Sequence, residues 1–480
     1  MTKVFDRRPH AMIVLGAVLV LSALPCNANP ADLSAALPAQ AGGSRLTLEA
    51  CLRQALSSNR QLQAARFTAE KANWDRRNAW SQFAPRISFN TEVTRIDEQT
   101  LAERDFSRYF PPEIPVPRVA YRTSYYSSFN AHIPIFNAEL INGLSVATTG
   151  QAAAERTREA TRDRILLQVT SGYLDVLKRG AMLELQREFL VLTGLNVEKA
   201  ERMHRAGRYS KLDLLRWQVE HQQQKSSVAV GESALRDATV RLRRLLNLRA
   251  LTADALVDRV PDRLEAEVTR VAGLSEPEIR RLAGVDSRTL VDGNAMLAAA
   301  EQDRERSRLV YRGQYSSYLP DVSLSYSTAW RRNDTPALDD YRPSVIMLNL
   351  SVPLFTGFRN LSRLKSAQFS YRAQDTRFSD MVDETRQALG ETVNRIVNLK
   401  TQRELIRTSL TYNENNYRIV SREKAHGRVS NLDVIDAKLN LQNARLLEIT
   451  TQFDLTSAVI ELRYLMGSLD DLVEEIVERK

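Results

Sequence analysis

Cysteine is nearly absent from this chain of 480 residues, which contains Cys26 and Cys51. Cys26 lies in an amino-terminal segment that we expect to be removed on export. The exported form would then keep Cys51 alone and could form no intrachain disulfide. Cys51 falls on a helix predicted over residues 48–56, where we expect it to pack as a small apolar side chain.

Long hydrophobic runs are also absent. No apolar run reaches the roughly 18 residues that a membrane-spanning helix needs. Charged residues make up 26% of the chain, and the mean hydropathy is −0.35. These values argue against a polytopic helical membrane protein.

The longest apolar stretch, residues 11–24, has the form of a secretory signal. Basic residues precede it and Cys26-Asn27-Ala28 follows, which places small residues at −3 and −1 of a cleavage site. We predict a signal peptide at 1–28 and an extension without assigned structure at 29–45. The alternative is an uncleaved anchor. Pro25 is unsuited to lipoprotein processing at Cys26, so we expect a mature terminus near Asn29 without lipid.

Residue patterns that carry catalysis or bind metals are missing. The five histidines show no metal-ligand spacing, and neither His-Glu-x-x-His nor a phosphate-binding glycine loop occurs. The net charge of +9 is spread along the chain, without the basic and aromatic interleaving that follows a nucleic acid. We therefore predict no enzyme activity, no metal or other cofactor and no nucleic-acid partner.

The chain does contain an internal duplication. Ile-Pro-Ile-Phe-Asn at 133–137 returns as Val-Pro-Leu-Phe-Thr at 352–356, and Ala-Gly-Arg-Tyr-Ser-Lys-Leu-Asp-Leu-Leu at 206–215 returns as His-Gly-Arg-Val-Ser-Asn-Leu-Asp-Val-Ile at 426–435. Both motifs return at nearly the same offset, which far exceeds a solenoid period of roughly 20 to 50 residues. We predict repeat 1 at 46–247, a linker at 248–286, repeat 2 at 287–467 and a tail at 468–480.

Alternation with a period of two predicts two strands in each repeat, at about 85–95 and 125–134 and at about 320–330 and 344–353. Each has an apolar face, such as Ile346, Leu348 and Leu350, opposite a polar face that includes Asn349. Segments of this length edged by aromatic residues are typical of an outer-membrane barrel with interfacial girdles. A half-buried soluble hairpin would show the same alternation.

Each repeat continues with two long helices, predicted at 138–206 and 210–247 and at 357–425 and 430–466. The last helix carries a heptad line with polar members: Leu432, Ile435, Leu439, Gln442, Leu446, Ile449, Phe453, Thr456, Ile460 and Arg463. The equivalent line of repeat 1 is more polar: Leu212, Leu215, Val219, Gln222, Ser226, Ala229, Ser233, Arg236, Val240 and Arg243. Such lines favour helices packed around a water-filled lumen. Prolines and glycines in the linker predict short helices folded against the middle of the long ones.

The turns between the long helices have a strong local signal. Gly207 and Gly427 can take the left-handed position after a helix. Ser210 with Asp213, and Ser430 with Asp433, have the spacing of a capping box. Capping alone would account for both aspartates. Asp436 lies one turn further, beyond capping reach, and Arg216 occupies its place in repeat 1.

Together these motifs resemble the TolC family of outer-membrane efflux proteins over residues 46–469. The resemblance implies an α+β membrane protein: a homotrimer with a twelve-stranded outer-membrane barrel, four strands from each chain, continued by a long periplasmic α-helical coiled-coil barrel. Independently, four strands leave two open edges that hydrocarbon does not tolerate, and eight is the usual minimum for closure.

The resemblance also implies a function. It is that of a passive exit duct in a tripartite efflux or type I secretion system, docking to a periplasmic adaptor and an inner-membrane RND, ABC or MFS pump. Asp433 and Asp436 match acidic positions that ring a closed periplasmic entrance, and Asp213 matches a partner in the closing network. Val429 stands where a closing arginine is expected, one residue after Arg428. The residues assigned to the entrance turns and adaptor docking are Gly207, Arg208, Ser210, Asp213, Gly427, Arg428 and Ser430. The alternative is a structural periplasmic coiled-coil protein without a channel.

Overall fold

The computed structural model describes residues 45–104, 109–111, 113–114, 121–257, 259–282, 284–332, 338 and 343–477. The predicted signal peptide and nearly all of the predicted extension lie outside the described residues.

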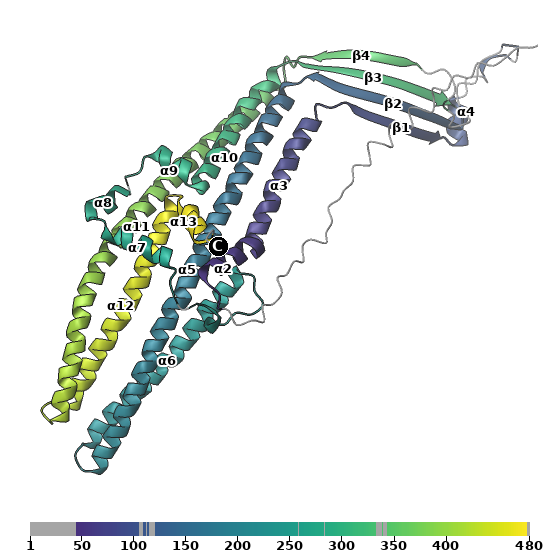
Figure 1. The fold of residues 1–480 in the computed structure, drawn as a ribbon. Helices are drawn as coiled ribbons and strands as arrows, with labels where there is room; N and C mark the ends of the chain where they lie inside the picture. Colours follow the sequence, from purple (N-terminus) through teal and green to yellow (C-terminus); the bar gives the residue numbers. More distant parts are fainter. Residues whose placement is uncertain are drawn as a thin grey trace, which may run out of the picture. The chain divides into compact units, whose positions relative to one another are not determined.

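Four strands form one antiparallel sheet in the order β1-β2-β3-β4 (Figure 1). Their bounds are Arg86–Arg95, Thr123–Phe136, Asp321–Arg332 and Ser344–Ser351. β2 extends two residues beyond each end of the predicted segment. β4 ends two residues before the predicted end, close to Pro353, which has no N–H group for the ladder. The connection between β1 and β2 contains α4, Glu98–Arg104.

The strand register places the four predicted apolar rows on one face of the sheet. Phe89 lies opposite Phe129, and Leu324 lies opposite Leu348. Directly paired residues share a face, so these rows are continuous across the sheet. Polar rows occupy the other face, where Ser323 pairs with Asn349. The sequence-based face assignment is therefore confirmed.

Each repeat continues from the sheet into a helical hairpin. In repeat 1, α5 (Ala138–Arg205) turns back as α6 (Lys211–Leu245). In repeat 2, α11 (Arg359–Ala425) turns back as α12 (Asn431–Leu465). With 68 residues, α5 is about 100 Å long at 1.5 Å per residue.

Shorter helices complete one layer beside the sheet-proximal parts of α5 and α11. α3 (Arg60–Ser81) packs on α5, and α10 (Ala295–Gly313) packs on both α5 and α11. The helices therefore follow the order α3-α5-α10-α11, which parallels the order of the strands (Figure 1).

The main core lies around the middle of α5. Cys51 on α2 (Leu48–Ser58) is 1% exposed there, packed with Tyr173 of α5 and Leu242 of α6. Burial raises the pKa of the Cys51 thiol to about 12. The prediction that Cys51 packs as a small apolar residue is confirmed.

The linker forms short helices against the middle of the long helices of both hairpins. Its elements are η3 (Ala253–Ala255), α7 (Asp262–Gly273), α8 (Glu276–Leu282) and, at the start of the second repeat, α9 (Ser287–Gly293). Val271 and Ile279 are buried against Leu389 and Ile396 of α11. A 3-10 helix, η4 (Gln314–Tyr318), precedes β3.

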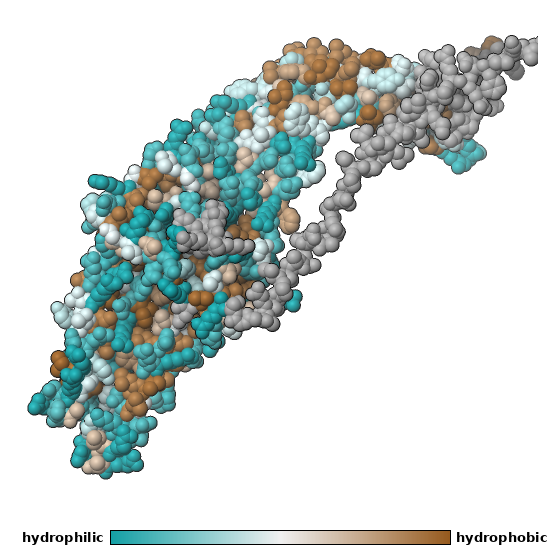
Figure 2. Space-filling model, in the orientation of Figure 1, coloured by the Kyte–Doolittle hydropathy of each residue, from teal (hydrophilic) through white to brown (hydrophobic). Residues whose placement is uncertain are grey.

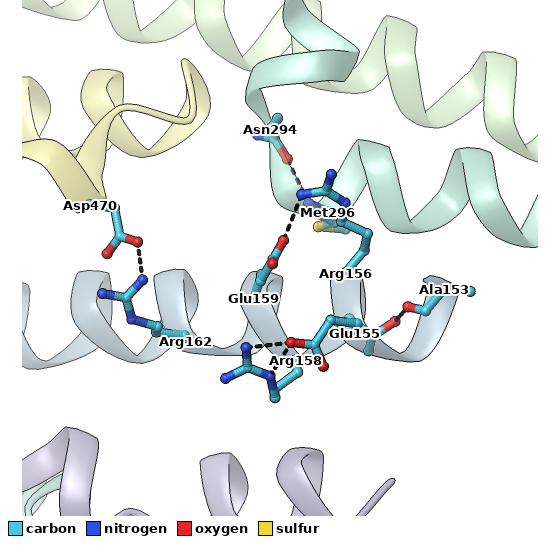
Figure 3. Close-up of polar contacts among 10 residues, drawn as sticks. Ala153, Glu155, Arg156, Arg158, Glu159, Arg162, Asn294, Met296 and Asp470 are labelled. Atoms are coloured by element: carbon cyan, nitrogen blue, oxygen red, sulfur yellow. Dashed lines mark hydrogen bonds and ion pairs between the residues drawn. The ribbon is translucent and has the colours of Figure 1, made fainter. Parts of the chain in front are cut away.

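The predicted tail contains one more helix, α13 (Leu469–Val477). Leu469 and Val473 bury themselves in the main core. Asp470 forms an ion pair with Arg162 of α5 (Figure 3). None of the described helices has the length and apolar character needed to cross a membrane.

Candidate functional site

The two turns that end the hairpins have the same backbone geometry. Gly207 has φ +69° and Gly427 has φ +74°. At the first turn, the Arg208 N–H donates to the Met203 carbonyl at 2.8 Å, and the Gly207 N–H donates to the His204 carbonyl at 2.9 Å. The same two bonds recur at the equivalent positions of the second turn. This is the Schellman arrangement, in which glycine avoids the strain that a side chain would meet.

Both return helices begin with a capping box. The Asp213 N–H donates to Ser210 Oγ at 3.1 Å, and the Ser210 N–H and hydroxyl donate to Asp213 Oδ2. Ser430 and Asp433 repeat the arrangement. Hydrogen bonds from the serines lower the pKa of both aspartates. Each aspartate therefore has a structural role at its helix start.

Asp436 differs from the capping aspartates. It is exposed on α12, one turn after Asp433, and it makes no ion pair with another described side chain. Capping does not account for it.

Contacts between the hairpins begin at the turns. Lys424 lies over the ring of Tyr209, with Nζ 4.8 Å from the ring centroid. The buried Asn431 side chain lies beside Asp213 and, after Ser210, helps to lower the pKa of that carboxyl. Arg428 forms an ion pair with Glu423 of its own hairpin at 3.2 Å. Its counterpart Arg208 has Met203 at the position equivalent to Glu423.

Above the turns, α6 and α12 meet along a seam whose paired residues have a constant offset in the sequence. Trp217 and Ile435 are 3% and 7% exposed and belong to one apolar cluster. The Gln442 side chain donates to Gln224 Oε1 at 3.1 Å. Asp213 and Asn431 lie at the end of the seam nearest the turns. The pair of Trp217 and Ile435 and then the pair of Gln224 and Gln442 follow along the seam.

A buried ion pair lies along the seam between the pair of Trp217 and Ile435 and the pair of Gln224 and Gln442. The Lys438 ammonium contacts the Glu220 carboxylate, and the two side chains are 0% and 7% exposed. Lys438 Nζ also lies 5.7 Å from the ring centroid of Phe189 on α5. The pair thus ties α12 to the first hairpin at a largely buried position.

The seam differs from the predicted heptad lines. On α12, Ile435 and Gln442 of the predicted line are buried, but Leu432 is 43% exposed. On α6, the predicted line is exposed in the single chain, with Leu212 at 57% and Val219 at 56%. Within one chain a different line of α6, through Trp217, Glu220 and Gln224, is the buried one.

The predicted α12 line contained Ile435 and Gln442 of the seam, but the other seam residues, namely Trp217, Glu220 and Gln224 of α6 and Asn431 and Lys438 of α12, were not on the predicted lines. A line through Asp213, Trp217, Glu220 and Gln224 has coiled-coil spacing, and so does its partner line through Asn431, Ile435, Lys438 and Gln442. The constant offset was the available signal. The charged members concealed it, because heptad searches select apolar residues.

Ionisable groups near the turns form no metal centre. Within the described parts of the chain, no cluster of three or more histidine, cysteine, aspartate or glutamate side chains could hold a metal ion. His426 is exposed. His204 is half-buried, with Nδ1 2.9 Å from the Tyr209 carbonyl oxygen.

The sheet has a second surface of functional interest. Ile346, Leu348 and Leu350 on the apolar face of β4 are 74%, 66% and 64% exposed. Figure 2 shows hydrophobic residues gathered over β4 and its junction with α11. Such a surface needs a partner or a lipid environment to cover it.

Known proteins share this architecture. The family model for outer membrane efflux proteins matches residues 51–248 and 288–468. Outer membrane protein TolC of Vibrio cholerae is 22% identical over 341 residues, covering 68% of this chain and 73% of that protein.

Solved structures show the same fold. The Campylobacter jejuni CmeC outer membrane channel superposes with a TM-score of 0.74 at 13% identity, over 90% of this chain and 89% of that chain. The outer membrane protein VceC of Vibrio cholerae superposes with a TM-score of 0.72 at 17% identity, over 88% and 96%. These matches confirm the predicted α+β fold with a duplicated repeat and do not favour a structural coiled-coil protein without a channel. The chain belongs to the outer membrane efflux protein family and is an outer-membrane channel component of an efflux system.

Proposed function

We propose that three copies of the chain form a passive exit duct that crosses the outer membrane and reaches through the periplasm to an adaptor and an inner-membrane pump. The observation that carries this proposal is that the sheet and the helical layer of one chain both end in uncovered elements. These are β1 and β4 in the sheet and α3 and α11 in the layer. The duct performs no chemistry itself, so the free energy of transport comes from the pump.

The two outer strands support assembly from several copies. Every residue of β1 and every residue of β4 is exposed in the single chain. Their outer edges carry unpaired N–H and carbonyl groups, which hydrocarbon does not tolerate. Pairing β4 of one copy with β1 of the next removes both edges, and three copies supply twelve strands, above the usual minimum of eight.

The outer helices support the same assembly. α3 exposes Phe67 (63%) and Trp74 (58%), and α11 exposes Phe369 (62%). These helices are the two ends of the order α3-α5-α10-α11, so α11 of one copy would meet α3 of the next. Their apolar side chains would then be covered.

The hairpins also carry uncovered apolar lines. α11 exposes Leu405, Tyr412 and Ile419 at seven-residue intervals, the spacing of a coiled-coil stripe. The exposed line of α6, which includes Leu212, Leu215 and Val219, lies on the first hairpin. We propose that these lines pack between neighbouring copies.

At the far ends of the hairpins we propose the periplasmic entrance. Three copies of Asp433 and Asp436 would meet near one axis, where crowded carboxylates repel one another and attract cations. The contacts between Tyr209 and Lys424 and between Asp213 and Asn431 would hold the entrance closed in place of the arginine that Val429 replaces. The turn residues Gly207, Arg208, Ser210, Gly427, Arg428 and Ser430 would face the adaptor.

Assembly is tested by the mass of the protein extracted from outer-membrane fractions in mild detergent. The proposal predicts a particle of three chains. Trp74→Glu and Phe369→Glu should each shift the particle toward single chains, whereas Thr68→Glu, exposed on α3 but about 100° around the helix axis from Phe67, should not. Single chains of the unsubstituted protein in the soluble periplasmic fraction would contradict the proposal.

A further inference from the structure

The apolar face of the sheet carries two charged residues in its described strands, and both are arginines. Arg95 is the last residue of β1, and Arg332 is the last residue of β3. Arg95 lies opposite Thr123, and Arg332 lies opposite Tyr125, the next residue of β2 on the same face. Both arginines therefore continue the apolar rows at one end of the sheet.

That end of the sheet lies away from the helices. β1 follows α3, and β3 follows α10 through η4, so both strands begin beside the helical layer. β1 has 10 residues and rises roughly 25 Å if it is tilted by about 40°, which matches the apolar band of an outer-membrane barrel. In the proposed duct, Arg95 and Arg332 would lie where the hydrocarbon of the membrane meets the outer surface.

The opposite end of the same face has a different composition. Where the strands meet the helices, Phe136 lies opposite Val322, and Val322 lies opposite Leu350. Head groups of the inner leaflet would face this apolar row, in which no strand residue carries a charge. The lipid-facing cations of the described sheet are thus confined to its outer end.

The described carboxylates that follow β1 are engaged elsewhere. Asp97 accepts hydrogen bonds from the Thr100 N–H at 2.9 Å and from the Thr100 hydroxyl at 2.8 Å. Glu98 pairs with Arg122 at 3.6 Å. Arg95 is exposed and forms no ion pair with another described residue, so its guanidinium is available to an anion outside the chain.

Protection of an open strand edge would account for one arginine but not for the other. Charged residues are common on edge strands because they prevent pairing with another chain. β1 is at the edge of the sheet, but β3 lies between β2 and β4. An arginine on the apolar face of an internal strand indicates a role toward the surroundings of the sheet.

The chemistry of the outer end fits a phosphorylated amphiphile. The planar guanidinium of arginine can donate two parallel hydrogen bonds to a phosphate. Tyr125 lies between the two arginine positions, and Trp330 occupies the next row toward the helices. Such aromatic residues suit the boundary between hydrocarbon and head groups, and the apolar rows beyond them would contact acyl chains.

We propose that Arg95 and Arg332 form a binding site for the phosphorylated lipid A part of lipopolysaccharide on the lipid-facing side of each chain. The proposal rests on the proposed function, in which the barrel crosses the outer membrane with its helices in the periplasm. Lipopolysaccharide occupies the outer leaflet of that membrane, and phospholipid occupies the inner leaflet. Cations at the outer end alone therefore select lipopolysaccharide over an anionic phospholipid.

The full trimer, stripped of lipid in mild detergent, provides the first test. It is titrated with lipid A that carries both phosphates and with lipid A from which both have been removed, and native mass spectrometry counts the bound molecules. The phosphorylated form should bind about tenfold more tightly, because charge-assisted hydrogen bonds are lost with the phosphates. Equal binding of the two forms would overturn the proposal, and this comparison requires no substituted protein.

A pair of double variants locates the site. Arg95→Gln combined with Arg332→Gln should weaken binding of phosphorylated lipid A about tenfold and leave binding of the dephosphorylated form unchanged. The matched control, Arg86→Gln combined with Arg331→Gln, removes the same charge from the polar face of the same two strands. It should bind like the unsubstituted protein, and equal loss in both double variants would overturn the proposal.

Titration with phosphatidylglycerol distinguishes the two leaflets as the source of the lipid. Its binding should be weaker than that of phosphorylated lipid A. Phosphatidylglycerol that binds as tightly, and loses as much affinity in the Arg95→Gln and Arg332→Gln variant, would overturn the proposal in favour of phospholipid.

The same trimers separate the lipid A site from the proposed duct. Trimers that conduct ions in a planar bilayer but bind both forms of lipid A equally overturn the lipid A site alone. Trimers that prefer phosphorylated lipid A through Arg95 and Arg332 but pass no current contradict the duct and support the lipid A site.

Discussion

The ammonium group of Lys438 on α12 contacts the carboxylate of Glu220 on α6, and the two side chains are 0% and 7% exposed. The residues belong to different repeats, so the contact joins the return helices of the two hairpins. Desolvation of two charges offsets most of their attraction. We therefore expect the pair to specify which residues of α6 face α12 more than it adds stability.

Removing one member of this pair should cost far more than removing both. Lys438→Met alone leaves a buried carboxylate, and Glu220→Gln alone leaves a buried ammonium, at about 3 to 5 kcal/mol each. Glu220→Leu combined with Lys438→Met should recover most of that loss. Amide hydrogen exchange along α6 and α12 measures the local opening free energy. A double variant as unstable as the sum of the single variants would contradict the interpretation.

Alanine at two glycine positions should change stability in opposite directions. Gly427 has φ +74°, so Gly427→Ala should destabilise its turn by about 1 to 2 kcal/mol. Gly180 lies within α5, where an added Cβ would meet no atom within 4 Å. Gly180→Ala should stabilise by about 0.5 to 1 kcal/mol. Unfolding midpoints of the two variants provide the comparison, and equal shifts of the same sign would refute the turn assignment.

Arginine should be tolerated on one face of β4 but not on the other. Leu348 lies on the apolar face, opposite Leu324, and Asn349 lies on the polar face, opposite Ser323. Leu348→Arg should cost roughly 2 to 4 kcal/mol if it faces the middle of the membrane, whereas Asn349→Arg should assemble normally. The yield of detergent-resistant trimers from outer membranes measures the difference. Equal yields would show that the lipid-facing surface is misassigned.

We expect the free energy of unfolding to decrease as pH rises toward neutrality, because Asp163 loses its proton in the folded chain over this range. Burial, and then the neighbouring Asp470 carboxylate, raise the pKa of Asp163 to about 6, against the opposing Arg162 guanidinium. Unfolded aspartate has a pKa of about 3.9, so the folded chain binds this proton more tightly. The stabilisation is fully present below about pH 4 and is lost as pH rises through about 6.

Asp163→Asn removes that dependence. Relative to the unsubstituted protein, the variant should be more stabilised at pH 7 than at pH 4. Thermal unfolding midpoints at these two pH values test this expectation. A difference between the proteins that is the same at both pH values would exclude Asp163 as the titrating group.

Local patterns in the sequence predict most of the fold. Alternation predicted Leu324 and Leu348 to lie in the apolar rows of their strands, because side chains alternate strictly along a strand, and the register then brings the two rows together on one face. The glycine and serine spacing predicted both turns, since Schellman and capping geometry depend on a few adjacent residues. The repeat boundaries themselves remain a proposal.

The seam between α6 and α12 could not be found in the same way. It depends on which faces of two helices from different repeats meet, and no local rule decides that. Choosing apolar positions led to Leu432 and Leu439 instead of the adjacent Asn431 and Lys438. Lysine is rarely buried without a paired carboxylate. The burial of Lys438 therefore depends on Glu220, which lies in the other repeat and is not predicted by the sequence around Lys438.

Single-channel recording of the full trimer in a planar bilayer tests the central claim most directly. We expect a stable conductance with a preference for cations and block by divalent cations added on the periplasmic side, because six carboxylates would meet at the proposed entrance. Asp433→Ala combined with Asp436→Ala should weaken both properties while the trimer persists. Absence of conductance from correctly assembled trimers would contradict the exit duct, and unchanged block and selectivity in the double variant would remove the acidic ring from the mechanism.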